Sequence, residues 1–174
     1  MVIDMKKATT AGYLLLEAMG VDAQKEPYKN TPERYARLLV ELFGNKPQTI
    51  KTFEEDCSSG PITVKGHTVW TFCPHHMLPV QMVVDATYIP RKTEHGTVIV
   101  LGLSKLARIC TEIIQEGPAL QEKVTKRIAE RVLPYADLVS VEISGWHLCC
   151  AMRGVKSTST METSITLNRE DAIE

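Results

Sequence analysis

The sequence lacks any long apolar run and any strong excess of charge of one sign. Its 174 residues include 20 basic and 21 acidic side chains, so the formal net charge is −1. Balanced charge argues against general nucleic-acid binding, and no stretch approaches the ~18 apolar residues of a membrane span. The first residues also lack an apolar run followed by a small-residue cleavage site. We therefore expect a cytoplasmic globular protein whose partners include neither nucleic acid nor a membrane.

Cysteines are few and odd in number. The chain contains Cys57, Cys73, Cys110, Cys149 and Cys150. Without a secretion signal, an odd count favours metal binding or reactivity over a disulfide framework. The length suits one domain, or a compact domain with an N-terminal helical extension.

The first third of the chain has helical patterning. Apolar residues cluster with helical spacing over residues 9–19, and a second helix is expected with Thr31 as N-cap and Pro32 at its first position. Its apolar side would comprise Tyr35, Leu38, Leu39 and Leu42. Residues 46–57 are polar and indicate a linker. We predict a helical arm over residues 1–56 and a second domain over residues 57–174.

The second domain has a mixed pattern. Residues 62–72 and 79–89 predict two antiparallel strands around a turn, and residues 103–114 predict a helix with Ser104 as its cap. Gly117 and Pro118 separate this helix from another over residues 120–132. Residues 139–143 and 158–167 predict two more strands. The order strand, strand, helix, helix, strand, strand indicates an α+β fold.

Two short clusters combine cysteine and histidine, at residues 73–76 (CPHH) and 147–150 (HLCC). Thiolates and imidazoles are the ligands that zinc prefers, and adjacent strands could bring the clusters together. If residues 147–150 continue a strand, His147 and Cys149 share one face while Cys150 points the opposite way. Each of these residues alone is more often a core residue, but together they favour a metal site. Spacing alone does not separate ligands from neighbouring histidines.

Five motifs, in order along the chain, resemble those of the GTP cyclohydrolase I family. They are residues 72–79 (FCPHHMLP), 86–90 (ATYIP), 102–108 (GLSKLAR), 120–122 (LQE) and 147–155 (HLCCAMRGV). The resemblance spans about residues 72–164 and is weaker around residues 31–34. It implies the T-fold, in which two β-hairpins flank paired helices and subunits join their sheets into a barrel. It also implies a ring-stacked homo-oligomer, expected to be a decamer, with active sites at subunit boundaries.

The resemblance further implies a catalytic zinc site. Cys73, His76 and Cys149 match the family's zinc ligands, and His75 and His147 match histidines that move protons. Three protein ligands leave the fourth position of zinc open, as catalysis requires. Pro74 stands where the family usually has glutamate, which removes a carboxylate and a backbone N–H beside the metal.

The substrate implied by the resemblance is GTP. Gln121 and Glu122 match the residues that recognise the purine, and a carboxylate suits the two parallel donors of guanine. The phosphate-binding positions of the family correspond to Ser104, Lys105, Arg108 and Arg153. The implied reaction hydrolyses GTP to 7,8-dihydroneopterin triphosphate and formate, a step of pterin and tetrahydrofolate biosynthesis.

Two other interpretations remain open from the sequence. One is a T-fold enzyme that acts on a related purine or pterin, or stops at the ring-opened formamide. The other is a non-catalytic assembly module in which Cys150 completes a closed zinc site with Cys73, His76 and Cys149. A closed site needs four protein ligands, whereas a catalytic site keeps one position for water.

Overall fold

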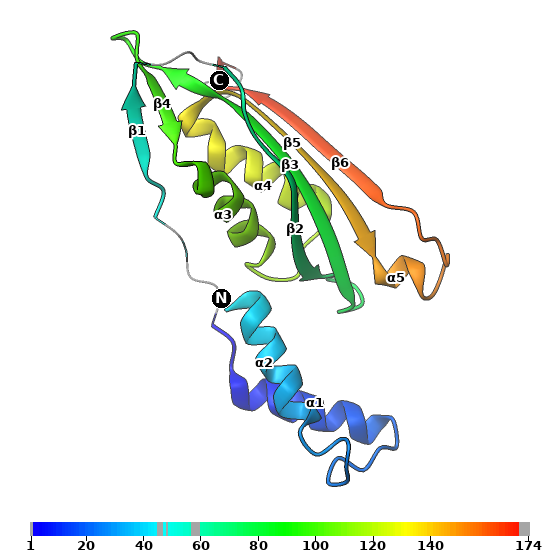
Figure 1. Cartoon of the computed structure of the whole chain (residues 1–174). Helices are drawn as coiled ribbons and strands as arrows, with labels where there is room; N and C mark the ends of the chain where they lie inside the picture. The colour runs from blue at the N-terminus through cyan, green and yellow to red at the C-terminus, as the bar shows by residue number, and fades with distance from the viewer. Residues whose placement is uncertain (1, 45–46, 48, 57–59, 171–174) are drawn as a thin grey trace. The chain divides into compact units, whose positions relative to one another are not determined.

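The computed structural model describes residues 2–44, 47, 49–56 and 60–170, so Cys57 lies outside the described residues. The chain forms two compact units, residues 1–46 and residues 47–174 (Figure 1).

The N-terminal unit pairs two helices, α1 (Met5–Ala18) and α2 (Thr31–Phe43). Asp4 caps α1 by accepting a hydrogen bond from the backbone N–H of Lys7 at 3.1 Å. The N-cap of α2 is Asn30, one residue before the predicted Thr31, and Pro32 lies in the first turn as expected. The residues that α2 buries are Pro32, Ala36 and Phe43.

The predicted apolar side of α2 was only partly correct. Tyr35, Leu39 and Leu42 are half-buried, but Leu38 remains 39% exposed. Small residues take the closest contact instead, because α1 and α2 approach through Gly12 and Pro32. A Cβ on Gly12 would lie 2.8 Å from the Cα of Pro32. The two helices therefore meet where Gly12 has no side chain, and the spacing of hydrophobic residues did not predict this contact.

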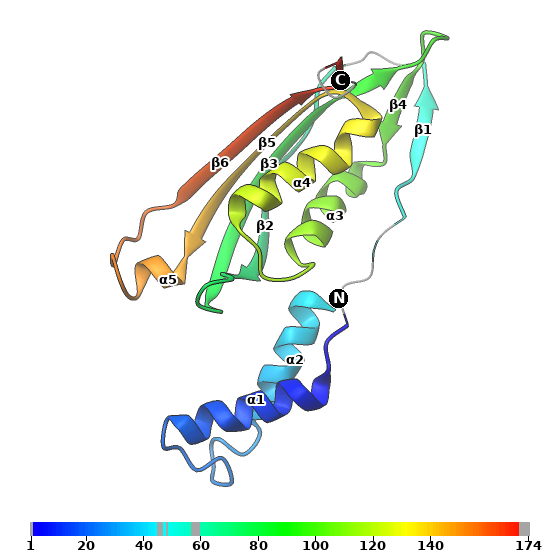
Figure 2. The same ribbon diagram turned by 180° about the vertical axis from the view of Figure 1, so that it is seen from behind.

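The C-terminal unit is an antiparallel sheet with two helices on one face (Figures 1 and 2). Its main strands are β2 (Ile62–Phe72), β3 (Pro79–Lys92), β5 (Ala136–His147) and β6 (Met161–Asn168), which lie side by side in that order. The helices are α3 (Leu103–Ile114) and α4 (Gln121–Val132). Alternate residues of β3 are buried beneath them, including Met82, Val84 and Tyr88. These two antiparallel pairs with paired helices are the T-fold, an α+β architecture.

Two further strands lie where no strand was predicted. β1 (Thr52–Glu55) forms within the polar stretch taken as a linker, and it pairs with β4 (Val98–Leu101). β4 in turn pairs with the end of β3, which continues to Lys92. The hydroxyl of Tyr88 accepts a hydrogen bond from the backbone N–H of Leu101 at 2.9 Å. β1 was missed because it is polar, and β4 was missed because its apolar run has only four residues.

The helix starts also differ in detail from the sequence prediction. Gly102, not Ser104, occupies the N-cap of α3, and no side chain caps it. Leu120 precedes the first residue of α4, Gln121. Ser104 therefore lies within the first turn of α3, where its side chain is exposed. Within the part of the chain that the structure describes, no helix is long and apolar enough to cross a membrane.

Candidate active site

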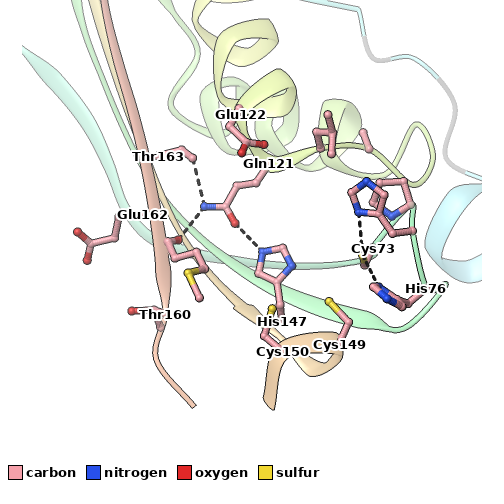
Figure 3. Close-up of a pocket in the computed structure, with 15 residues that line it drawn as sticks. Cys73, His76, Gln121, Glu122, His147, Cys149, Cys150, Thr160, Glu162 and Thr163 are labelled. Carbon is pink, nitrogen blue, oxygen red and sulfur yellow. Dashed lines mark hydrogen bonds between the residues drawn. The ribbon is translucent and has the colours of Figure 1, made fainter. Parts of the chain in front are cut away.

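One end of the C-terminal unit contains an open cavity of about 790 Å³. Its walls come from the β2–β3 turn, the start of α4, the short helix α5 (Leu148–Ala151) and the segment that enters β6 (Figure 3). The lining residues with polar or sulfur-containing side chains are Cys73, His75, His76, Gln121, Glu122, His147, Cys149, Cys150, Thr160, Met161, Glu162 and Thr163. The two clusters that the sequence singled out therefore meet in one cavity.

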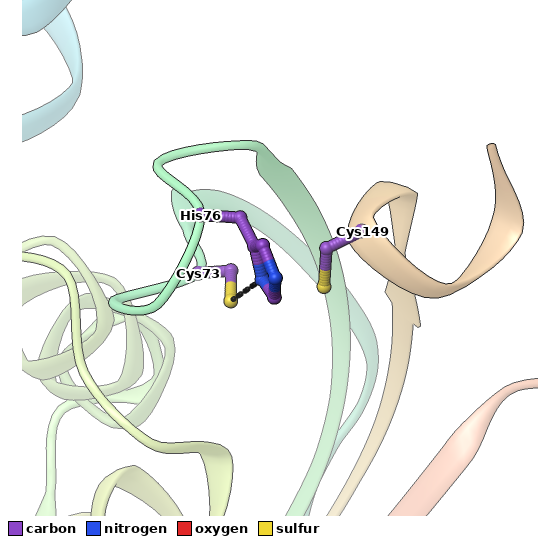
Figure 4. A group of neighbouring side chains, drawn as sticks. All are labelled: Cys73, His76 and Cys149. Atoms are coloured by element: carbon purple, nitrogen blue, oxygen red, sulfur yellow. Dashed lines mark hydrogen bonds between the residues drawn. The ribbon is translucent and has the colours of Figure 1, made fainter. Parts of the chain in front are cut away.

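Three of these side chains form a group that can hold a metal ion. The ligand atoms of Cys73, His76 and Cys149 all lie within 4.8 Å of one another (Figure 4). Cys73 follows the last residue of β2, and its backbone N–H donates to the carbonyl of Leu78 at 2.9 Å. Cys149 lies on α5, directly after β5. Pairing of Val80 with His147 brings the turn and α5 side by side.

The distances within this group suit a tetrahedral metal. Cys73 Sγ lies 3.7 Å from His76 Nδ1. A sulfur and a nitrogen that share one zinc ion at its usual bond lengths stand about 3.6 Å apart. Cys73 and Cys149 are 4% and 8% exposed, and burial, followed by the neighbouring Cys73, raises the pKa of Cys149 to about 11. A bound cation would reverse that penalty on the thiolate. Two sulfurs and one imidazole therefore fit zinc and leave a fourth position open.

Strand alternation predicts that Cys150 points away from the metal ligands, but the structure shows that this segment is not a strand. β5 ends at His147, and Cys149 and Cys150 occupy one helical turn rather than a strand. Strand alternation therefore does not apply to them. The group of mutually close ligand atoms includes Cys149 and not Cys150, although Cys150 lines the same cavity.

Both remaining histidines of the two clusters also face the cavity. His75 Nδ1 lies 3.8 Å from Cys73 Sγ. His147 Nε2 lies 2.8 Å from Gln121 Oε1, and burial lowers the pKa of His147 while the charge of Glu122 opposes that effect. Two imidazole rings thus line the same cavity as Cys73, His76 and Cys149, and an imidazole can act as an acid or a base in catalysis.

Gln121 and Glu122 begin α4 but have different surroundings. Glu122 is exposed and lines the cavity, close to the positive end of the helix dipole. Gln121 is only 5% exposed. Its Nε2 faces three acceptors, the carbonyls of Ile143 and Met161 and the hydroxyl of Thr163. Its side chain is therefore held within the protein, whereas that of Glu122 is accessible to a ligand.

Arg153, in the loop after α5, contacts His76 of the possible metal site formed by Cys73, His76 and Cys149. Its guanidinium donates to His76 Nε2 at 2.7 Å. This bond requires the proton of a neutral His76 ring to sit on Nδ1. A metal bound at Nδ1 would move that proton to Nε2, so metal binding there and this contact are mutually exclusive. Binding of the metal would thus release Arg153.

The predicted phosphate residues on α3 lie elsewhere in the fold. Among the described residues, those that line the cavity do not include Ser104, Lys105 or Arg108. These three belong to α3, whose first turns follow β4 (Figures 1 and 2). The cavity lies at the start of α4. The 12 residues of α3 span about 18 Å. One copy of the chain does not bring these side chains into the cavity.

Gly145 is a site residue that sequence reasoning missed. A Cβ at this position would lie 1.9 Å from Gln121 Oε1 and 2.9 Å from His147 Nε2. Thr163, from β6, was missed as well. The only sequence signal was a glycine near the end of an otherwise regular strand, which often marks a close approach.

Known proteins with similar sequences identify the family of this chain. The family model for GTP cyclohydrolase I matches residues 8–171. A GTP cyclohydrolase 1 of Clostridium perfringens is 37% identical over 172 residues, covering 95% of this chain and 89% of that protein. One of Thermoanaerobacter pseudethanolicus is 38% identical over 161 residues, covering 89% and 82%. Among solved structures, an archaeosine synthase QueF-Like in the apo form has a TM-score of 0.46 and 16% identity, covering 64% and 95%.

The family match extends through both units. It begins within α1 and ends just after β6, so it includes both cysteine and histidine clusters. Relatives at this identity and coverage leave no large part of the chain unmatched. This chain therefore belongs to the GTP cyclohydrolase I family.

Proposed function

We propose that this protein is a GTP cyclohydrolase that converts GTP and one net water into 7,8-dihydroneopterin triphosphate and formate. The observation that carries the proposal is the metal-type group of Cys73, His76 and Cys149 in a cavity shared with His75, His147 and Glu122. We infer the reaction of these residues from membership of the GTP cyclohydrolase I family.

Zinc is the metal that we propose for this group, held by Cys73, His76 and Cys149. When bound, it lowers the pKa of water and thereby supplies hydroxide near neutral pH. The sulfur and nitrogen donors and their 3.7 Å separation support this choice. Oxygen-preferring ions such as magnesium would find no carboxylate in the group.

Glu122 is the residue that we assign to the guanine base. Its carboxylate can accept from N1–H and from the exocyclic amine together. It is exposed on the cavity wall at the start of a helix, so a ligand can reach it. Gln121, predicted beside it at the purine, contributes to the same wall, but its carboxamide is engaged by β5 and β6.

His75 and His147 are the groups that we assign to proton transfer. Opening the imidazole ring of guanine at C8, releasing formate and re-closing the ring each require protons to be added or removed. Histidine titrates near neutral pH and can serve in both directions. Both rings line the cavity, and His75 Nδ1 lies 3.8 Å from the sulfur of the proposed ligand Cys73.

The triphosphate requires cations, and among the described residues none that lines the cavity is a lysine or an arginine. We propose that Arg153 binds it from the same subunit once it has left His76, and that Ser104, Lys105 and Arg108 come from a neighbouring copy. This agrees with the ring-stacked homo-oligomer, a decamer, that the family resemblance implies. A cytoplasmic location and a place in pterin and tetrahydrofolate biosynthesis remain predictions.

The test is to incubate the zinc-loaded protein with GTP and to follow the products by liquid chromatography with mass detection. Formate and dihydroneopterin triphosphate should appear together. Accumulation of the ring-opened formamide would show an enzyme that stops after the first hydrolysis. Unchanged GTP, with zinc bound and the protein folded, would refute the proposed activity. The substitution His147→Asn serves as the inactive control.

A further inference from the structure

Two hydrogen bonds donated by the NH₂ group of Gln121 determine the orientation of its carboxamide. Nε2 lies 3.0 Å from the carbonyl oxygen of Ile143 and 2.7 Å from that of Met161. Both oxygens can only accept, so the NH₂ group must face them. The orientation of this amide is therefore determined by its surroundings, and Oε1 has to point the other way, towards His147 (Figure 3).

This orientation determines the state of the His147 ring. Gln121 Oε1 can only accept, so the 2.8 Å contact requires a proton on His147 Nε2. In the neutral ring, Nδ1 is then the nitrogen with a lone pair. The bond also restrains rotation of the imidazole, because Gln121 is itself tied to two strands. Ring orientation and tautomer are thus set from outside the ring.

Gly145 supplies the space in which this bond forms. A Cβ there would lie 1.9 Å from Gln121 Oε1, 2.9 Å from Gln121 Cδ and 2.9 Å from His147 Nε2. Gly145 is held in β5 by pairing with Met82 and Met161 on its two sides, so its backbone has little freedom to move away. Any larger side chain would have to displace the carboxamide or the imidazole.

We propose that Gln121 is a positioning residue that acts through His147, with Gly145 as the residue that permits the contact. The carboxamide does not itself bind the purine, because its NH₂ group donates to carbonyls of β5 and β6 and its oxygen accepts from His147. Its task is to hold the imidazole of His147 in one orientation, with Nε2 facing Gln121. The role of His147 in proton transfer rests on the proposed function, but the hydrogen-bond arrangement does not.

The kinetic test uses Gly145→Ala in the full-length, zinc-loaded protein. The added methyl group should push Oε1 away from His147 without deleting any hydrogen-bonding group. We expect kcat to fall about 10- to 100-fold, while KM for GTP stays within about threefold of wild type because Glu122 is untouched. Gly60→Ala is the matched control, since nothing lies within 4 Å of a Cβ at that position.

Gln121→Asn provides a second variant in case Gly145→Ala does not fold. Its shorter amide can keep its donors on the strand carbonyls, but its oxygen cannot also reach His147. The same fall in kcat at nearly constant KM is expected. A higher KM with kcat unchanged would instead assign Gln121 to direct purine binding and overturn the proposal. Wild-type kinetics in both variants would overturn it as well.

Nitrogen NMR gives a readout that needs no turnover. In protein labelled with ¹⁵N-histidine, solid-state spectra should show His147 with a hydrogen-bonded proton on Nε2 and a bare Nδ1. The His147→Asn variant identifies the signals. Gly145→Ala and Gln121→Asn should shift them, and Gly60→Ala should not. Unchanged His147 signals in folded Gly145→Ala would overturn the proposal, even if GTP proved not to be the substrate.

Discussion

Val80 of β3 pairs with His147 of β5, and this single register position joins the two halves of the candidate metal site. Val80 follows the turn that carries Cys73 and His76, and His147 precedes the helix that carries Cys149. Antiparallel pairing therefore brings together ligands more than seventy positions apart in the sequence. A shift of the register by one residue would reverse the faces of these strands and separate the ligands.

Metal content separates the open site from a closed one. Cys149→Ala should lose zinc, because the remaining cysteine and histidine provide only two donors from the group. Cys150→Ala is the matched control, one position further along the same helical turn. It should keep one zinc per chain, measured by inductively coupled plasma mass spectrometry. Loss of zinc from Cys150→Ala would instead support the closed, non-catalytic site.

Removing the charge of Glu122 should weaken binding of the base. In Glu122→Gln, an NH₂ donor replaces one carboxylate oxygen and meets a donor of guanine. At least one charge-assisted hydrogen bond is therefore lost. Such bonds contribute about 1.5–3 kcal/mol, which corresponds to a fall in kcat/KM of about 10- to 150-fold. Steady-state kinetics with GTP measures it, and zinc content should stay at the wild-type level. Glu130→Gln, on the same helix and paired with Lys126 at 3.6 Å, should have wild-type kinetics.

Cys110 should be inert in the native protein. Its side chain is fully buried on α3, and desolvation raises the pKa of its thiol from 9.0 to about 12. Iodoacetamide at pH 8 reacts with thiolates, so Cys110 should be alkylated only after unfolding. Peptide mass spectrometry with and without denaturant measures this. Rapid labelling of Cys110 in the folded protein would contradict its burial.

The same thiol has a consequence for stability at high pH. Because its pKa is raised on folding, Cys110 keeps its full contribution to stability below pH 9, the pKa of the unfolded thiol. That contribution is lost as the pH rises from 9 towards about 12, since only the unfolded chain then releases the proton. In Cys110→Ala, the part of the alkaline loss due to this thiol should be absent, as measured by urea unfolding at pH 8 and pH 10.

Tyr88 should stabilise the junction between β3 and β4. In Tyr88→Phe, the buried N–H of Leu101 loses the hydroxyl that accepts its hydrogen bond at 2.9 Å. A buried donor without its acceptor costs about 1–3 kcal/mol, so the free energy of unfolding should fall by that amount. Chemical denaturation followed by circular dichroism measures the change. Tyr13→Phe, at an exposed position of α1, is the control and should leave stability unchanged.

Prediction from the sequence was most successful where a local pattern decides the structure. The strand over residues 62–72 coincides with β2, and the helix over residues 103–114 coincides with α3. The helix has a hydrophobic period of 3.6 residues, and the strand is rich in β-branched and aromatic residues. β1 is polar and short, and β4, although apolar, has only four residues, so the sequence did not reveal their pairing. Cys149 and Cys150 were placed in a strand because nothing local marks the end of β5 at His147.

The sequence by itself determined the family, the α+β fold and the residue types of the metal site, because ordered motifs and periodicity are local properties. The tertiary structure alone decided how those residues are used. It placed Gln121 in a buried hydrogen-bond network and Glu122 at the cavity surface, although they are neighbours in the chain. It also showed why residue 145 is a glycine, because Gln121 and His147 form their hydrogen bond in the space that a Cβ would occupy.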